Sequence, residues 1–388
     1  MDKKNKRIYL DYAATTPCDP QIIKAMMPYF TKKFGNTSSV HQFGQEVRIA
    51  LEKSRRFIAE QLNANRQEII FTSSASESNN TVLKGIASAN KDKGNHLIIT
   101  QIEHDCIING AKWLENNGFQ ITRIPVDKEG KVNPKDVEKS IKKETILVSV
   151  MHANNEIGTI QPIKKIGRIC RNKRVLFHTD ASQTFGKLPI DVKKEHIDLL
   201  TASSHKIYGP KGAALLYVKK GININPLLHG GGHEWGLRSS TVNVPAIVGF
   251  SKALQIYQKK RKKEYQRLGK LKNKLIKGVI HNIPNVKING SISDSLSNIV
   301  NFLFLGIEGE AIAMHLDIKG IAVSTGSACS SESLLPSHVL KALKLKPEEI
   351  HGSIRFSLGR YTTEKEIDYV LQVLPEIINK LRRISPFN

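Results

Sequence analysis

Short apolar runs alternate with helix-length amphipathic stretches, and this alternation limits the possible folds more than any other feature of the chain. Strands are expected at 68–72, 96–100, 119–125, 145–150, 175–179 and 197–202, and helices at 77–90, 105–117, 134–143 and 162–173. The pattern predicts βαβ units that build a mostly parallel sheet with helices on both faces. The apolar run at 213–218 follows too closely for a crossover helix, so it is expected to pair antiparallel.

The C-terminal part of the chain has a different pattern. A long lysine-rich helix is expected at 245–278, and after it come fewer strands (297–304, 321–324, 353–358) and helices at 308–317, 336–343 and 363–383. At the other end, a strand at 7–12 and helices at 20–31 and 42–62 precede the alternating region. We therefore predict a large α/β domain over 15–260 and a smaller α+β domain formed by 1–14 and 261–388.

The composition excludes several classes of protein. No apolar run approaches the roughly 18 residues of a membrane span, and no apolar segment follows the charged N-terminus as in a secretory signal. The cysteines, Cys18, Cys106, Cys170 and Cys329, are scattered without a CxxC pair, which predicts a reduced, cytoplasmic protein with neither a zinc site nor a disulfide framework.

The net charge of +24 from 59 basic and 35 acidic residues has two readings. It could attract nucleic acid or an acidic protein partner. It could equally reflect a lysine-biased composition on solvated helix faces, as in the run at 259–263. No nucleic-acid module is recognisable and few aromatic residues lie among the charges, so the second reading is favoured and direct nucleic-acid binding is not expected.

Polar side chains follow the ends of the predicted strands. They are Ser73 to Glu77, Glu103 with His104, His152 to Glu156, Asp180 with Gln183, and Ser203 to Lys206. Each alone has an ordinary structural explanation, such as a helix cap or a surface histidine. Because ligands bind beyond the carboxyl ends of strands in open α/β sheets, the set predicts one site. An anion cradle, a carboxylate and a Schiff-base lysine, Lys206, together describe a pyridoxal phosphate site.

A second centre is predicted in the small, polar stretch at 323–331, where Cys329 is the only thiol. A structural cysteine usually lies in an apolar run, so Cys329 is expected to be an accessible nucleophile on a flexible loop. Downstream, Arg355 could clamp a substrate carboxylate or form a core-edge ion pair. His229, His233 and Glu234 lie in a glycine-rich stretch without the helical spacing of metal ligands, so no metal site is expected.

Several of these motifs resemble those of the cysteine desulfurases, which are class-V aminotransferase-type enzymes of PLP fold type I. The resembling segments are 9–17, 103–104, 151–158, 178–183, 204–212 and 326–329. The similarity covers nearly the whole chain, and the length of the Cys329 segment is similar to that of group I, in particular its housekeeping branch. The resemblance implies a seven-stranded, mostly parallel sheet between helices, and a homodimer.

The resemblance also implies a set of cofactor contacts: Ala75, Ser76, His104, Asn155, Asp180, Gln183, Ser203, His205, Lys206 and, from the other protomer, Thr241. In this scheme Lys206 binds the aldehyde of pyridoxal phosphate and later moves the substrate's Cα proton. Asp180 pairs with the pyridinium nitrogen, and Gln183 pairs with the ring oxygen.

The remaining implied roles concern L-cysteine, the implied substrate. His104 stacks on the cofactor ring and takes part in proton transfer, while Asn155 and Arg355 bind the substrate carboxylate. Cys329 attacks the substrate sulfur, which leaves a persulfide and releases L-alanine. The sulfur would pass to an iron–sulfur cluster scaffold protein, a tRNA-thiolation relay or other acceptors, with no membrane involved.

Two alternatives stay open at the level of sequence: a selenocysteine lyase, which would share the site, and a non-catalytic sulfur-transfer scaffold. The chain also departs from the family's usual pattern at Thr37, Ser74, Ser76 and Ser240, where the family has Pro, Gly, Thr and Gly. Ser74 and Ser240 add side chains beside the expected phosphate site. The chain ends at Asn388, before the C-terminal tail that contributes to scaffold docking in the family.

Overall fold

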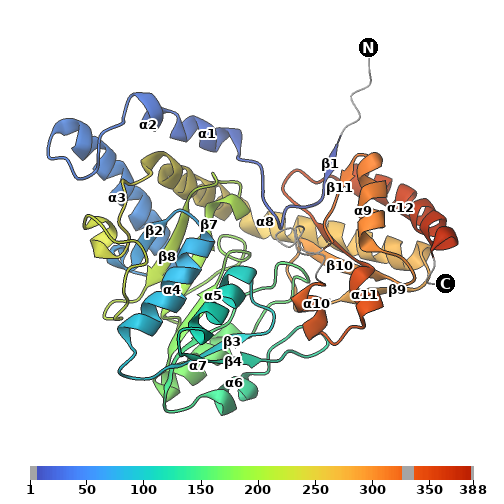
Figure 1. Cartoon of the computed structure of the whole chain (residues 1–388). Coiled ribbons are helices and arrows are strands. Elements are labelled where there is room, and N and C mark those ends of the chain that lie inside the picture. Colours follow the sequence, from blue (N-terminus) through green and yellow to red (C-terminus); the bar gives the residue numbers. More distant parts are fainter. Residues whose placement is uncertain (1–6, 326–335, 386–388) are drawn as a thin grey trace.

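The computed structural model describes residues 7–325 and 336–385 (Figure 1). Its largest sheet has seven strands: β2 (Ile69–Thr72), β3 (His96–Thr100), β4 (Gln120–Ile124), β5 (Thr145–Ser149), β6 (Leu176–Asp180), β7 (Leu199–Ser203) and β8 (Ala214–Val218). Their order is β2-β8-β7-β6-β5-β3-β4. All neighbours pair parallel except β8, which is antiparallel to both β7 and β2, as predicted for 213–218.

Both faces of this sheet are buried, which explains why its strands read as continuous apolar runs. Alternate residues point to opposite faces: Leu97 packs with one hydrophobic cluster and Ile98 with another. Helices α4 (Ala75–Ala89) and α5 (Asp105–Glu115) contribute to the cluster of Leu97. On the other face lie α3 (Gln42–Leu62), α6 (Pro134–Ser140), α7 (Ile163–Lys173) and the start of α8.

Helix α8 (Val244–Asn282) joins this sheet to the C-terminal part of the molecule (Figure 1). Its buried apolar residues from Ala246 to Tyr257 belong to the core of the large sheet. From Leu268 onward they belong to a separate core, which is shared with the C-terminal helix and strands. One helix therefore contributes to two hydrophobic cores in succession.

The second core lies around a three-stranded antiparallel sheet in the order β12-β10-β9, made of β9 (Val286–Asn289), β10 (Ile299–Phe304) and β12 (Ser353–Ser357). Helices α9 (Gly309–Ile318) and α12 (Glu364–Ile384) pack in this core, whereas the buried apolar side chains of α10 (His338–Ala342) and α11 (Pro347–His351) belong to the core of the large sheet. The N-terminus returns here, since β1 (Ile8–Tyr9) pairs parallel with β11 (Ile321–Ala322). The strand expected at 7–12 is thus reduced to two residues.

The single helix expected at 20–31 is wrong. The chain forms α1 (Pro20–Met26) and α2 (Pro28–Thr31), which meet at Met27. Pro28 has no amide N–H for the hydrogen bond to residue 24, so one continuous helix cannot keep its bonding pattern there. Short 3₁₀ turns complete the architecture at η1 (Arg66–Glu68), η2 (Ser204–Lys206) and η3 (His233–Gly236). Among the described residues, no helix has both the length and the hydropathy needed to cross a bilayer.

Candidate active site

A cavity of about 460 Å³ opens at the carboxyl ends of the large sheet. Since β4 and β5 lie on opposite sides of β3, the strand order reverses there, and such switch points are where α/β sheets bind ligands. The cavity is lined by most of the residues expected to form the site: Ala75, Ser76, His104, Asn155, Asp180, Gln183, Ser203, His205, Lys206 and Arg355. The fold thus brings together side chains that are far apart in the sequence.

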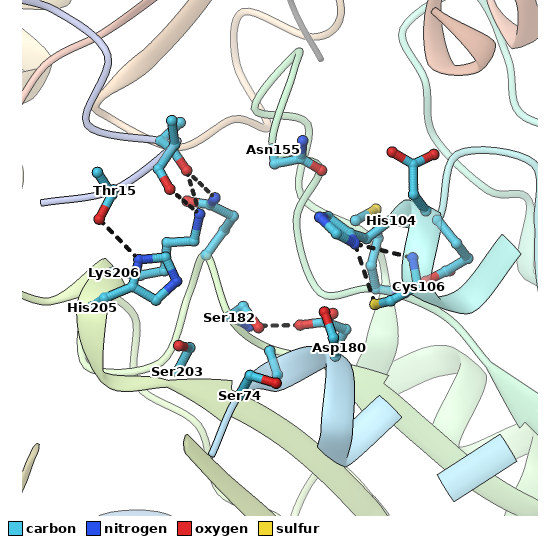
Figure 2. Close-up of a pocket in the computed structure, with 18 of the residues that line it drawn as sticks. Thr15, Ser74, His104, Cys106, Asn155, Asp180, Ser182, Ser203, His205 and Lys206 are labelled. Atoms are coloured by element: carbon cyan, nitrogen blue, oxygen red, sulfur yellow. Dashed lines mark hydrogen bonds between the residues drawn. The ribbon is translucent and has the colours of Figure 1, made fainter. Parts of the chain in front are cut away.

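Lys206 ends the 3₁₀ turn η2 immediately after β7, and its side chain reaches across the cavity to the N-terminal segment (Figure 2). Its Nζ donates hydrogen bonds to the carbonyl oxygens of Ala13 at 2.6 Å and Ala14 at 2.8 Å. These acceptors could not be predicted from the sequence, because they are backbone atoms of a segment more than 190 positions away. The amine is consequently held at a fixed place in the cavity.

His205 lies beside Lys206, and its Nδ1 is 3.1 Å from the Thr15 hydroxyl (Figure 2). Burial, together with the nearby cations Lys206 and Lys211, lowers the pKa of His205 to about 3. The ring is therefore neutral at pH 7 and can exchange hydrogen bonds without adding charge.

Asp180 closes the floor of the cavity at the end of β6 (Figure 2). Its Oδ1 accepts a hydrogen bond from the Ser182 amide at 2.8 Å, and its Oδ2 accepts one from Asn79 Nδ2 at 2.7 Å. Asn79 is fully buried on α4, one helical turn after Ser76, and this spacing is the sequence signal that could have identified it. The carboxylate is thereby fixed in orientation within the cavity.

The N-terminus of α4 supplies the backbone N–H groups of the predicted anion cradle. Ser74 is the N-cap, and its Oγ accepts a hydrogen bond from the Glu77 amide at 3.1 Å. The extra side chain at this position, where the family usually has glycine, therefore caps the helix.

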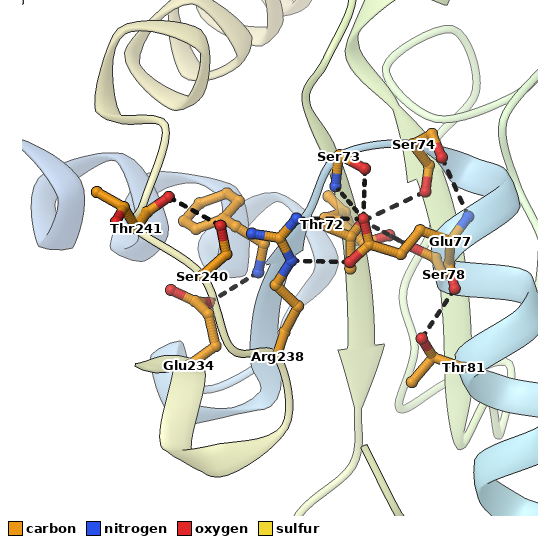
Figure 3. Close-up of polar contacts among 12 residues, drawn as sticks. Thr72, Ser73, Ser74, Glu77, Ser78, Thr81, Glu234, Arg238, Ser240 and Thr241 are labelled. Atoms are coloured by element: carbon orange, nitrogen blue, oxygen red, sulfur yellow. Dashed lines mark hydrogen bonds and ion pairs between the residues drawn. The ribbon is translucent and has the colours of Figure 1, made fainter. Parts of the chain in front are cut away.

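Glu77 lies in the first turn of α4 and binds Arg238, whose Nε is 2.8 Å from Oε1 (Figure 3). The amide and hydroxyl of Ser73 also donate to Glu77. Burial alone would raise the pKa of Glu77, but the hydrogen bonds from Arg238 and Ser73 outweigh it and lower the pKa. Arg238 was not among the residues predicted for the site, although it lies only three residues before the predicted Thr241.

His104 is the N-cap of α5 and faces the Lys206 side of the cavity (Figure 2). Its Nδ1 accepts a hydrogen bond from the Cys106 amide at 3.2 Å, so a neutral ring carries its proton on Nε2. Burial lowers the pKa of His104 and raises that of the neighbouring Cys106 thiol to about 12. Cys106 is therefore an un-ionised thiol at pH 7 and a poor nucleophile.

Glu103 is fully buried beside His104, and the sequence analysis assigned it no role. Its Oε1 accepts hydrogen bonds from Thr100 Oγ1 and the Met151 amide, both at 2.8 Å. Burial nevertheless raises the pKa of Glu103 to about 8. Its carbonyl accepts a hydrogen bond from His338 Nε2 at 2.8 Å, which joins α10 to the cavity wall.

Arg355 is the cationic group at the other end of the cavity, and its side chain is 2% exposed. Its Nη2 donates to Asp11 Oδ1 at 2.7 Å, and its Nη1 donates to the carbonyl of Asn155 at 3.0 Å. The ion pair expected for Arg355 is present, and the residue also lines the cavity, whereas its binding of a substrate carboxylate stays a prediction.

One of the expected site residues that the structure describes does not line this cavity. Thr241 lines a second cavity of about 260 Å³ next to Arg238 and Ser240 (Figure 3). Ser73 and Gly212 line both cavities, so the second lies beside the N-terminus of α4. Cys329 lies outside the described residues.

The residues present fit pyridoxal phosphate. An amine, a carboxylate and a helix N-terminus with Ser76 converge on one cavity, as required for the aldehyde, the ring nitrogen and the phosphate of this cofactor. The Ser182 hydroxyl also lines the cavity, is buried and has no hydrogen-bond partner among the described residues. Such a group is suited to a ligand that brings its own acceptors.

Comparisons with known proteins agree with this chemistry. The aminotransferase class-V family model matches residues 8–370. The cysteine desulfurase IscS of Clostridium botulinum strain Hall is 51% identical over 384 residues, 98% of this chain and 97% of that protein. Two solved structures are similar: a NifS-like protein (TM-score 0.91, 38% identity, covering 97% of this chain and 100% of that one) and SspA in complex with cysteine (0.82, 36%, 92% and 100%).

These relatives cover almost the full length of the chain at identities that establish a shared family. They confirm the resemblance and the fold class inferred from the sequence motifs. The chain therefore belongs to the class-V aminotransferase family and, within it, to the pyridoxal phosphate-dependent cysteine desulfurases.

Proposed function

We propose that this enzyme takes sulfur from L-cysteine, leaves it as a persulfide on Cys329 and releases L-alanine. The observation that carries the proposal is the convergence of Lys206, Asp180 and the α4 N-terminus on one cavity. The relative in complex with cysteine supports the choice of substrate. When bound, pyridoxal phosphate supplies the electron sink that makes the bond between Cβ and sulfur labile.

Substrate binding is assigned to the end of the cavity near Arg355. A guanidinium suits the substrate carboxylate because it can donate two parallel hydrogen bonds. Asn155, whose carbonyl contacts Arg355, lines the same end of the cavity and is placed to contribute its side-chain amide. The carboxylate would thus be fixed relative to Lys206.

Proton movement is assigned to two groups that face each other across the cavity. Lys206 Nζ takes the proton from Cα, and the Ala13 and Ala14 carbonyls that now accept from it keep the protonated amine in place. His104 holds a proton on Nε2 that it can donate, since burial keeps the ring neutral. Cys329 then attacks the substrate sulfur as a thiolate, and the bond from sulfur to Cβ breaks. The electron pair of that bond stays on Cβ, which takes up a proton and becomes the methyl group of alanine.

The persulfide is tested by mass spectrometry of the intact protein after exposure to L-cysteine, followed by peptide mapping. We expect one added sulfur on Cys329 and an equal amount of alanine. Cys329→Ser should keep the cofactor's visible absorption and lose the added sulfur. Release of sulfide by Cys329→Ser at the wild-type rate would contradict the assignment of the nucleophile.

We also propose a homodimer in which Thr241 serves the cofactor of the partner subunit. Thr241 lines a cavity other than that of Lys206 in its own chain, which supports this arrangement. A patch of exposed apolar side chains on and around α1, α2 and α3 offers a surface to bury: Ile23, Met27, Phe30, Phe34, Val40, Phe43 and Ile49. Light scattering should give twice the mass of one chain, and Val40→Glu should shift the mass toward the monomer.

We also propose a cytoplasmic location and two domains, a large one at 15–260 and a smaller one at 1–14 and 261–388. The change of core along α8 between Tyr257 and Leu268 supports the domain boundary.

For the sulfur acceptor we propose an acidic protein such as a cluster scaffold, because the net charge is +24. Binding of such a scaffold should weaken as salt rises, and binding independent of salt would contradict an electrostatic contribution.

A further inference from the structure

Lys187 is a buried lysine that has no part in the chemistry described above. It follows β6 in the turn that carries Gln183, and it is 8% exposed. Its Nζ donates a hydrogen bond to Gln183 Oε1 at 3.4 Å. A lysine is rarely buried unless its ammonium group has a function or a partner, so this position calls for an explanation.

More cationic side chains than carboxylates surround Lys187. Lys206 and His205 face it from η2, while Tyr257, Arg261, Glu264 and Tyr265 face it from α8. Burial, with a contribution from Lys206, lowers the pKa of Lys187 to about 7, and Glu264 acts in the opposite direction. The small cavity beside it has a volume of about 10 Å³, which is too small for a ligand.

The two ends of the Gln183 amide have different partners. Oε1 accepts from Lys187, and Nε2 donates to the Ala13 carbonyl at 3.0 Å. The same carbonyl accepts from Lys206 Nζ. The protonated Lys187 amine has only donors, so below its lowered pKa it faces the oxygen of the amide and not its NH₂ group. Protonated Lys187 and the Ala13 carbonyl therefore both favour the orientation in which the donor end of Gln183 points toward the cavity.

We propose that Lys187 is a positioning residue that fixes the Gln183 amide with its N–H end toward the ring oxygen of the bound cofactor. The inference rests on the proposed function, because it concerns the cofactor held by Lys206. A donor to the ring oxygen disfavours a proton shared between that oxygen and the Lys206 nitrogen. Loss of Lys187 should therefore raise the pH at which the visible absorption of the bound cofactor titrates.

The experiment uses the cofactor-loaded protein and follows its visible absorption against pH. Lys187→Met should raise the midpoint by roughly 0.5–1 pH unit and weaken cofactor binding about fivefold, the size expected for one neutral hydrogen bond. Lys272→Met is the matched control. Lys272 is also buried, with a pKa lowered to about 8, but it binds Ser295 and Leu296 away from the cavity. That variant should lose stability and titrate as the wild type.

The double variant with Gln183→Ala tests whether Lys187 acts through the amide. We expect Gln183→Ala to raise the midpoint as well, and Lys187→Met to add nothing in that background. A wild-type midpoint in Lys187→Met, or shifts that add in the double variant, would overturn the proposal. If Lys187→Met does not fold, Lys187→Gln makes the same test, because a neutral amide can present either end to Gln183. A wild-type protein without the absorption band would instead refute the proposed function.

Discussion

Replacement of Arg238, which forms an ion pair with Glu77, should lower the free energy of unfolding by about 2 kcal/mol at pH 7. Arg238 Nε lies 2.8 Å from Glu77 Oε1, and the side chains are 17% and 10% exposed. Removal of one partner costs roughly 3–5 kcal/mol in fully buried pairs, while exposed pairs are worth about 0.2–1 kcal/mol. This pair lies between those limits, which gives the expected loss for Arg238→Met.

The loss should depend on pH in a defined direction. Hydrogen bonds from Arg238 and Ser73 lower the pKa of Glu77 in spite of its burial. A lowered carboxyl pKa contributes stability above the pKa of the unfolded chain, about 4.3, and that contribution is lost as the pH falls through the folded-state pKa. The difference in unfolding free energy between wild type and Arg238→Met should therefore be largest at pH 7 and shrink below pH 4.

The assay is urea unfolding of the cofactor-free protein at pH 7 and at about pH 3, followed by tryptophan fluorescence. Arg238→Met with Glu77→Gln should recover part of the loss at pH 7, because no unpaired carboxylate remains. Arg123→Met is a matched control: its partner is Glu115, both side chains are 34% exposed, and its loss should stay below about 1 kcal/mol. Equal losses for Arg238→Met at both pH values, with no recovery in the double variant, would refute the reasoning.

Three further predictions concern single contacts. Arg355→Gln should raise KM for L-cysteine about 100-fold, because the substrate carboxylate loses a charged partner, and it should leave the spectrum of the bound cofactor unchanged. An unaltered KM in steady-state assays would argue against binding of the substrate carboxylate by Arg355. Arg55→Met should lower the unfolding free energy by roughly 3–5 kcal/mol, because its pair with Glu234 is 3% exposed on both sides; a loss under about 1 kcal/mol in urea unfolding would contradict this. Gly209→Ala should weaken cofactor binding, because a Cβ at this position would lie 2.0 Å from Ser204 Oγ in η2. Equilibrium dialysis measures the affinity, and a wild-type value would show that the turn adjusts freely.

The main sheet and much of the site could be predicted because both follow from a simple pattern. Buried parallel strands read as apolar runs, and the first polar residue after each run lies at the edge where ligands bind. His104, Asp180 and Lys206 were identified in this way. Asp180 is the last residue of β6 and not the first residue after it, so the predicted strand end differs from the observed one by a single residue.

Other features depend on tertiary contacts that no local pattern encodes. The acceptors of Lys206 are carbonyls of Ala13 and Ala14, and backbone atoms carry no sequence signal. The pairing of Arg238 with Glu77 joins residues 161 positions apart. Strand β9 was missed because Val286–Asn289 is a short, half-buried strand, which among the described residues forms the edge of its sheet beside β10. The break at Met27, in contrast, could have been predicted from Pro28.

The account depends most on Lys206 as the residue that holds the cofactor. The most direct measurement is borohydride reduction of the cofactor-loaded protein, which fixes lysine-bound pyridoxal phosphate covalently, followed by peptide mass mapping. We expect a single pyridoxyl-phosphate adduct on Lys206, with none in Lys206→Ala. An adduct on another lysine such as Lys187 or Lys211, or unchanged labelling of Lys206→Ala, would contradict the central claim.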